Sequence, residues 1–226
     1  MSSNVNEYAR LPLPRIAVLA SGSGTNLQAL LDATACGTLE AEVAVVVSNR
    51  ADAGALQRAA AAGVATVLLP LADRRDPGVR EAYDRRLAAV TGAFEPDLIV
   101  LAGWMLILSP WFLNAFPGRI VNVHPALLPD GDGVEVLTSH GRLPALRGPR
   151  TVRDALRRRL PATGATVHYV TNVVDCGPVI LREEVPILPG DDEDGLHERI
   201  KSVEHRLLPR GVAMALAEVS ATNVER

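Results

Sequence analysis

Residues 121–125 of this chain place an asparagine and a histidine two positions apart, directly after a run of apolar residues. In an extended segment, Asn122 and His124 project from the same face. An asparagine N–H can stabilise a developing oxyanion, and an imidazole can carry a proton near neutral pH. The pair therefore fits acyl transfer, although an Asn-x-His sequence also occurs as ordinary hydrogen bonding at the end of a strand.

A glycine-rich segment lies between the apolar run at residues 15–20 and a helical run at residues 27–31. This order predicts a phosphate site, because glycines let an anion approach the backbone and free N–H groups at a helix start can bind it. The predicted phosphate-binding residues are Gly22, Ser23, Gly24, Thr25 and Asn26. A tight turn with Thr25 or Asn26 as helix cap is the alternative. Without the Lys-Ser/Thr ending of a triphosphate loop or the third glycine of a dinucleotide loop, a mononucleotide-like phosphate fits better.

Strand and helix patterns alternate along the chain. The predicted strands are residues 16–20, 42–47, 64–68, 98–101, 120–123 and 166–170. The predicted helices are residues 26–35, 53–61, 79–91, 111–115 and 151–158. This alternation predicts an α/β fold with a mostly parallel, twisted sheet and helices on both faces. Ligands bind beyond the carboxyl ends of such strands, where the glycine-rich segment and the Asn-x-His pair both lie.

Five motifs occur in a fixed order, at residues 21–27, 103–105, 121–129, 164–168 and 175–180. In this order they resemble the motifs of the phosphoribosylglycinamide formyltransferase family, over most of the chain from Arg15 to about Ala215. The resemblance implies a Rossmann-like formyltransferase fold and an enzyme of purine biosynthesis. Such an enzyme transfers a formyl group from its co-substrate 10-formyltetrahydrofolate to the amine of glycinamide ribonucleotide, without a metal.

The same resemblance assigns catalytic roles. Asn122 is expected to stabilise the oxyanion and His124 to assist proton transfer, while Asp175 positions His124 and a water. A carboxylate near an imidazole raises the imidazole pKa, and burial opposes this effect. The residues alone leave Asp175 open to another interpretation, since Asp-Cys-Gly-Pro is also a strong turn sequence.

The resemblance also assigns two residues to the ribonucleotide. Glu204 is expected to contact the ribose hydroxyls, and Lys201 is counted with it as substrate-binding. On a helix these two side chains share a face, so an ordinary surface ion pair is the alternative.

The folate pocket is predicted from three further segments. Its residues are Arg80, Met105, Leu106, Ile107, Leu108, Thr166 and His168. Arg80 could equally be a solvated helix arginine, and a lone histidine in a strand is commonly structural. Leu106 departs from the family pattern, which has an arginine at this position, so any contact made by that guanidinium is in doubt.

A second departure is an insertion at about residues 130–142, after the catalytic histidine. Its acidic, glycine-rich start predicts a flexible loop. Its closeness to His124 favours a lid that closes over the site without taking part in chemistry, and a tolerated surface excursion is the alternative. Asp130 and Asp132 lack the rest of a calcium loop, so no metal is assigned.

Related folate enzymes define the competing functions. A basic region that includes Arg147 and Gly148 is similar to methionyl-tRNA formyltransferases, which carry a further C-terminal domain for tRNA. Formyltetrahydrofolate hydrolase is the nearer alternative and carries a regulatory domain before the catalytic one. A catalytically silent folate- or nucleotide-binding protein is the remaining alternative. Formyl transfer to glycinamide ribonucleotide separates the enzyme from the binder.

Composition bounds these functions. The chain has 226 residues, of which 48% are hydrophobic, so it can bury a core, and its apolar runs are too short to span a bilayer. Two cysteines and no signal-peptide pattern predict the cytoplasm. The formal charge of −3 argues against a nucleic-acid partner. Glycinamide ribonucleotide and folate are the predicted partners of a monomer or homodimer.

The predicted organisation is an N-terminal tail and two closely joined halves. Residues 1–14 form the tail, and residues 15–118 form the half that binds the nucleotide phosphate. Residues 119–226 form the catalytic and folate-binding half, which carries the insertion.

Overall fold

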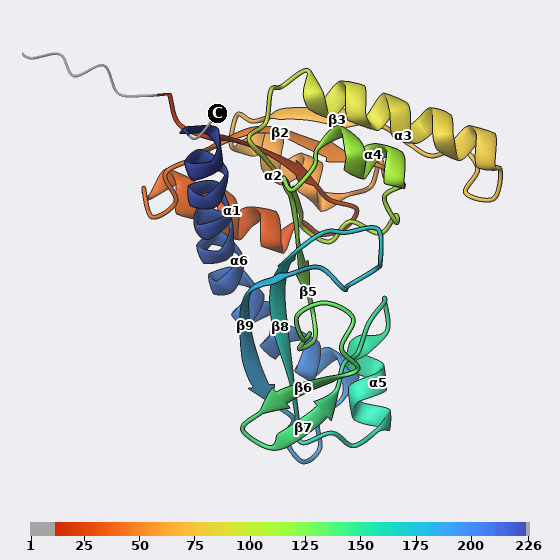
Figure 1. Cartoon of the computed structure of the whole chain (residues 1–226), viewed down its shortest axis with the longest axis vertical. Coiled ribbons are helices and arrows are strands. Elements are labelled where there is room, and N and C mark those ends of the chain that lie inside the picture. The colour runs from red at the N-terminus through yellow and green to blue at the C-terminus, as the bar shows by residue number, and fades with distance from the viewer. Residues whose placement is uncertain (1–11, 225–226) are drawn as a thin grey trace, which may run out of the picture.

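The computed structural model describes residues 12–224, so most of the predicted tail lies outside the described residues. Figure 1 shows strands through the centre of the molecule and helices around them. The main-sheet strands are β1 (Arg15–Leu19), β2 (Glu42–Ser48), β3 (Ala65–Leu68), β4 (Leu98–Leu101), β5 (Ile120–His124), β8 (Ala162–Tyr169) and β9 (Val179–Pro186). The helices are α1 (Thr25–Ala35), α2 (Gly54–Ala61), α3 (Pro77–Gly92), α4 (Pro110–Ala115), α5 (Thr151–Arg157) and α6 (Glu193–Val224).

The main sheet has seven strands in the order β3-β2-β1-β4-β5-β8-β9. The first five pair in parallel, and β8 and β9 pair antiparallel. This confirms the predicted fold class. The chain leaves β1 toward β2 on one side and returns to β4 on the other, so the carboxyl ends of β1 and β4 flank a topological switch point where ligands bind in such sheets.

Alternate residues of each parallel strand point into two separate cores. Ile16 and Val18 of β1 pack with α1, α2 and α6, whereas Ala17 and Leu19 pack with α3 and α4. All four side chains are fully buried. Helices therefore cover both faces of the sheet, and this explains why its strands read as continuous apolar runs.

Four elements were not predicted. One is the long helix α6 (Figure 1), which contains Pro209. Another is the strand β9 at the sheet edge, most of whose residues are only partly buried, unlike those of the inner strands. The other two, β6 (Glu135–Thr138) and β7 (Gly141–Pro144), form a separate antiparallel sheet within the predicted insertion.

The two predicted halves share one sheet. Their boundary lies between α4 and β5, and β5 pairs with β4 across it, Ile99 with Ile120. The division of ligand binding between the halves stays a prediction. Within residues 12–224, no helix is both long and apolar enough to cross a membrane.

Close packing of β8 against its neighbours gives a first testable prediction. A Cβ atom at Gly164 would lie 2.2 Å from the Glu183 carbonyl oxygen and 2.6 Å from Leu127 Cδ2. We expect Gly164→Ala to lower the free energy of unfolding by about 1–3 kcal/mol, as overpacking does. Urea denaturation measures this change. In the control Gly92→Ala, the added methyl meets only the Phe116 ring at 3.8 Å, so equal stability of the two variants would contradict the prediction.

Candidate active site

The two polar residues of β5 face the antiparallel strand β8. Asn122 pairs with His168, and His124 pairs with Thr166. Directly opposed residues of an antiparallel pair project from the same face, so the four side chains form one polar group at the end of the sheet. His124 is 4% exposed and His168 is 2% exposed, so the group lies mainly in the interior.

A backbone carbonyl fixes the protonation of His124. The Nε2 atom lies 2.9 Å from the Leu146 carbonyl oxygen. A carbonyl only accepts hydrogen bonds, so Nε2 carries a proton. In the neutral imidazole the lone pair is then on Nδ1, which faces Asp175. Nδ1 is therefore the atom that can take up a proton.

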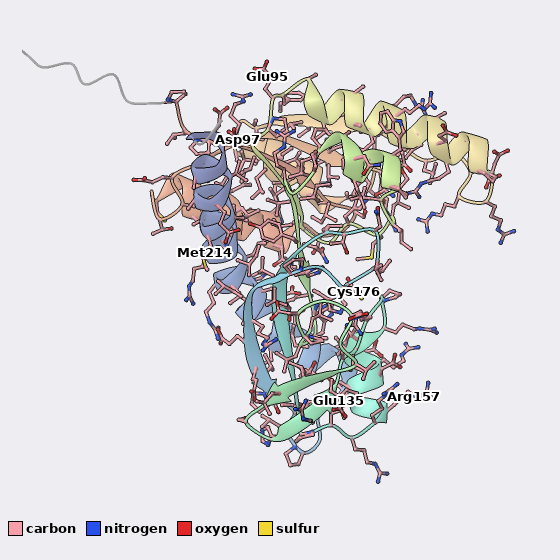
Figure 2. The ribbon with its side chains drawn as sticks, viewed as in Figure 1. Glu95, Asp97, Glu135, Arg157, Cys176 and Met214 are labelled. Carbon is pink, nitrogen blue, oxygen red and sulfur yellow. The ribbon has the colours of Figure 1, made fainter. Side chains whose placement is uncertain are left out.

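Asp175 lies between the two histidines, in the loop that joins β8 and β9. Its Oδ2 lies 3.6 Å from His124 Nδ1, and its Oδ1 lies 3.8 Å from His168 Nε2. Oδ2 also accepts a hydrogen bond from the Gly148 N–H at 2.8 Å. The structure thus brings Asp175 to His124, and its carboxylate is placed to stabilise an imidazolium. Figure 2 shows the neighbouring Cys176 in the middle of the molecule, between the α3–α4 layer and the β6–β7 hairpin.

His168 orients the amide of Asn122. Its Nδ1 lies 2.9 Å from the Tyr169 carbonyl oxygen and carries the proton, so Nε2 accepts from Asn122 Nδ2 at 3.2 Å. Burial lowers the pKa of His168 below its ordinary value, although the Tyr169 carbonyl and Asp175 oppose the shift. The ring therefore stays neutral at physiological pH and remains an acceptor. The structure places His168 in contact with Asn122, and its predicted position beside the folate stays a prediction.

Thr166 holds the chain that follows His124. Its hydroxyl donates to the Ala126 carbonyl at 2.7 Å and accepts from the Leu128 N–H at 3.0 Å. The residue is fully buried. Its polar groups are thus used inside the protein, and its predicted contact with folate stays a prediction.

The glycine-rich segment forms a helix start after β1. Gly24 precedes α1 with φ +76°, and no side chain caps this helix. A Cβ at Gly24 would lie 2.6 Å from Ala55 Cα, so only glycine fits. The first N–H groups of a helix lack intrahelical partners, and here they are available to an anion. The predicted capping alternative, with Thr25 or Asn26 as N-cap, is wrong because Gly24 takes that position.

Residues far apart in sequence meet beside this helix start. Asn26 Nδ2 donates to Glu204 Oε2 at 2.9 Å. Glu204 is 4% exposed, and burial raises its pKa, opposed by the bond from Asn26 and by the charge of Lys201. Lys201 itself pairs with Glu198 at 2.6 Å. Lys201 therefore forms a surface ion pair, but with Glu198 and not with Glu204 as the alternative had it. Glu204 instead faces the predicted phosphate loop.

The predicted folate segment after β4 alternates between core and surface. Leu106 and Leu108 are 6% and 7% exposed and belong to the core beside α3 and α4. Met105 and Ile107 are 64% and 71% exposed. Only the exposed pair offers side chains to a ligand, so at Leu106 and Leu108 any contact would come from the backbone.

Two contacts hold this folate segment in place. The Met105 N–H donates to the Ser21 hydroxyl at 3.0 Å, which ties the segment to the glycine-rich loop. Arg80 donates to the Ile107 carbonyl and pairs with the buried Asp84 at 3.1 Å. The Arg80 guanidinium is thus bonded within the protein and is not an isolated solvated group, while its predicted contact with folate stays a prediction.

The insertion has a different conformation from the predicted flexible loop. It forms the β6–β7 hairpin, whose Val136 and Leu143 pack on Leu127 and Ala162. Ser139, at the hairpin turn, donates its N–H and hydroxyl to Glu184 of β9 at 2.8 and 2.6 Å. The predicted irregular loop is wrong for residues 135–144, because Val136 and Leu143 give the hairpin its own buried face, while the flexibility of the acidic start stays a prediction. Movement as a lid would break these contacts.

Sequence reasoning missed the backbone of residues 146–148. Leu146 and Gly148 contact His124 and Asp175 directly, yet they bear no side chain that signals such a role. The nearest sequence feature that pointed to this region was the glycine-rich start of the insertion, at Gly131 and Gly133. Among residues 12–224, no group of three or more His, Cys, Asp or Glu side chains is arranged to hold a metal ion.

A family model and several named relatives match this chain. The family model described as formyl transferase matches residues 14–212. The chain is 42% identical over 194 residues to the phosphoribosylglycinamide formyltransferase of Escherichia coli (strain K12). The match covers 86% of this chain and 83% of that protein. It is 45% identical over 212 residues to the phosphoribosylglycinamide formyltransferase of Mycobacterium tuberculosis (strain CDC 1551 / Oshkosh). That match covers 94% of this chain and 89% of the relative.

A solved structure shows the same similarity. The glycinamide ribonucleotide transformylase 1 from Symbiobacterium toebii superposes with a TM-score of 0.82 at 41% identity, and the match covers 96% of this chain and 94% of that chain. The similarity includes the whole main sheet rather than a single motif.

The burial of a neutral His168 predicts a pH dependence of stability. Its pKa is lowered in the folded state, so the unfolded chain binds a proton more readily as the pH falls below about 6.5. The contribution of His168 to the free energy of unfolding is thus present above this pH and is lost below it. We expect His168→Gln to reduce the decline in stability between about pH 7 and pH 5, measured by urea denaturation.

The exposed His140 at the hairpin turn provides the matched control, because His140→Gln also removes one histidine. The control should keep the wild-type pH dependence. A His168→Gln variant whose stability declines as steeply as that of the wild type would contradict the prediction.

Proposed function

The chain belongs to the formyl transferase family, and from this premise we propose that it transfers the formyl group of 10-formyltetrahydrofolate to the amine of glycinamide ribonucleotide. Its named relatives are phosphoribosylglycinamide formyltransferases, enzymes of purine biosynthesis. The observation that carries the proposal is the meeting of Asn122, His124 and Asp175 at the sheet edge that also holds the glycine-rich helix start.

The first step forms a carbon–nitrogen bond. The amine nitrogen of the ribonucleotide attacks the formyl carbon, and the electrons of the carbonyl double bond move to its oxygen. Asn122 Nδ2 has two N–H groups, one of which is held by His168. The other donates to the developing oxyanion, which is an effective arrangement because the amide is oriented before the reaction begins.

Proton transfer completes the reaction. The attacking amine becomes positively charged and loses a proton, which His124 Nδ1 accepts because Nε2 is already protonated against Leu146. Asp175 Oδ2, 3.6 Å from Nδ1, stabilises the resulting imidazolium. As the tetrahedral intermediate collapses, the bond from carbon to the folate nitrogen breaks, and that nitrogen gains the proton. Tetrahydrofolate and formylated ribonucleotide are the products.

The ligands extend from this centre in two directions. The substrate phosphate is proposed to bind the N–H groups at the start of α1, and the ribose hydroxyls donate to Glu204, which Asn26 already orients. The folate is proposed to lie on the exposed Met105 and Ile107, next to Arg80. This division supports separate recognition of acceptor and donor.

The direct test is formyl transfer by the purified protein. We expect formylated glycinamide ribonucleotide to appear from 10-formyltetrahydrofolate, measured by the absorbance of released tetrahydrofolate products and by mass spectrometry of the nucleotide. A reaction without acceptor measures formyl release to water. Release of formate in both reactions, with no formylated nucleotide, would identify a hydrolase instead.

Asn122 should be essential to this activity. We expect Asn122→Ala to lower kcat about 10²- to 10³-fold, because an oriented donor to the oxyanion is lost. Asn114, exposed on α4, gives the matched control Asn114→Ala with unchanged kcat. Equal activity of the two folded variants would remove Asn122 from the mechanism.

Glu204 should act on the acceptor alone. We expect Glu204→Gln to raise the KM for glycinamide ribonucleotide about tenfold, because a hydrogen bond to a charged group contributes about 1.5–3 kcal/mol. The KM for the folate should change little. Steady-state kinetics with each substrate varied in turn make this comparison, and an equal rise in both KM values would indicate a general disturbance of the site.

A further inference from the structure

Arg147 connects the insertion to the catalytic loop. Its Nε donates to the Asp175 carbonyl oxygen at 3.0 Å, and one terminal nitrogen donates to the carbonyls of Gly131 and Gly133 at 3.2 and 2.7 Å. These acceptors come from two loops that are separated by more than 40 positions in the sequence. The guanidinium therefore joins the start of the insertion to the residue that carries the catalytic carboxylate.

The neighbours of Arg147 contact both catalytic groups. The Leu146 carbonyl accepts from His124 Nε2, and the Gly148 N–H donates to Asp175 Oδ2. Both contacts are made by the backbone, so their geometry depends on where residues 146–148 are held. Two side chains hold this segment: Leu146 packs with Ala126 and Ala155, and Arg147 makes the hydrogen bonds to the two neighbouring loops.

The backbone of Asp175 needs such support. Its φ of +53° lies in the left-handed region, which aspartate adopts less readily than glycine. The bond from Arg147 to its carbonyl and the bond from Gly148 to its carboxylate hold this residue from both ends. Without them, the backbone and the carboxylate are free to leave the position 3.6 Å from His124.

Arginine suits this role better than lysine. The guanidinium presents a rigid fork of N–H donors, and here it reaches three carbonyl oxygens in different directions. A lysine ammonium is a single point of charge on a flexible stem and cannot span the same set. Because its partners are neutral carbonyls, Arg147 acts here through geometry.

We propose that Arg147 is a positioning residue for formyl transfer, which couples the 130–142 insertion to the His124–Asp175 pair. The inference rests on the proposed function for its kinetic consequence, and on the structure alone for the positioning itself. The competing role is direct binding of an anionic part of the folate or the substrate. That role would act on KM, whereas positioning acts on the chemical step.

The kinetic experiment compares Arg147→Gln with Arg157→Gln. Arg157 is exposed on α5 and points away from the molecule in Figure 2, so the same change there is a matched control. We expect Arg147→Gln to lower the single-turnover rate about 10- to 100-fold, as displacement of a catalytic group does, with both KM values within about twofold of wild type. Arg147→Lys should also have a strongly lowered single-turnover rate. Guanidinium ion added at millimolar concentration should restore part of the rate of Arg147→Gln.

A second measurement is independent of activity. Nitrogen-15 NMR of the histidine side chains detects the protonated Nε2 of His124, which is protected by its bond to Leu146. We expect this signal to broaden or shift in Arg147→Gln and Arg147→Lys, and to remain in Arg157→Gln. If the wild type fails to formylate the ribonucleotide but these changes occur, the proposed function fails and the positioning role stands.

Two outcomes would overturn the inference. A folded Arg147→Gln variant with wild-type single-turnover rate and an unchanged His124 signal would show that the contacts are dispensable. A raised KM with an unchanged rate would make Arg147 a ligand-binding residue. Circular dichroism confirms folding of each variant, and Arg147→Lys supplies the test if Arg147→Gln does not fold.

Discussion

The register between β5 and β8 is the constraint on which the active site depends. It sets His168 opposite Asn122 and Thr166 opposite His124. A slip of one residue would turn each of these side chains to the other face of the sheet. With the observed register, His168 orients the amide of Asn122. Thr166 holds the chain that follows His124. Cross-strand pairing thus places Asn122 and His124, the proposed catalytic residues, beside the residues that support them.

The change from parallel to antiparallel pairing at β5 gives the site its shape. The parallel strands β1, β4 and β5 place the glycine-rich loop, the predicted folate segment and the Asn-x-His pair at their carboxyl ends. The loop that joins the antiparallel strands β8 and β9 brings Asp175 Oδ2 to 3.6 Å from His124 Nδ1. The proposed site therefore combines a glycine-rich helix start with the neighbouring side chains of His124 and Asp175.

The insertion belongs to this arrangement instead of standing apart from it. Its hairpin packs on the first residues of β8 through Val136 and Leu143, and it bonds to β9 through Ser139. The segment that follows the hairpin forms backbone hydrogen bonds with both His124 and Asp175. Extra residues next to the proposed active site can thus take over part of its support, because the backbone of Leu146 and Gly148 bonds to His124 and Asp175.

The sequence by itself determined the features that depend on local patterns. The inner strands, the first five helices, the glycine-rich helix start and the Asn-x-His pair were all predicted, because periodicity and turn chemistry act over a few residues. The tertiary structure decided what depends on distant partners: Glu204 beside Asn26, Asp175 between two histidines, and the burial of Leu106. The hairpin and α6 belong here as well, since packing against the sheet stabilises them more than their own pattern indicates. The physical reason is that hydrogen bonds and burial between segments far apart in sequence exist only once the sheet has brought those segments together.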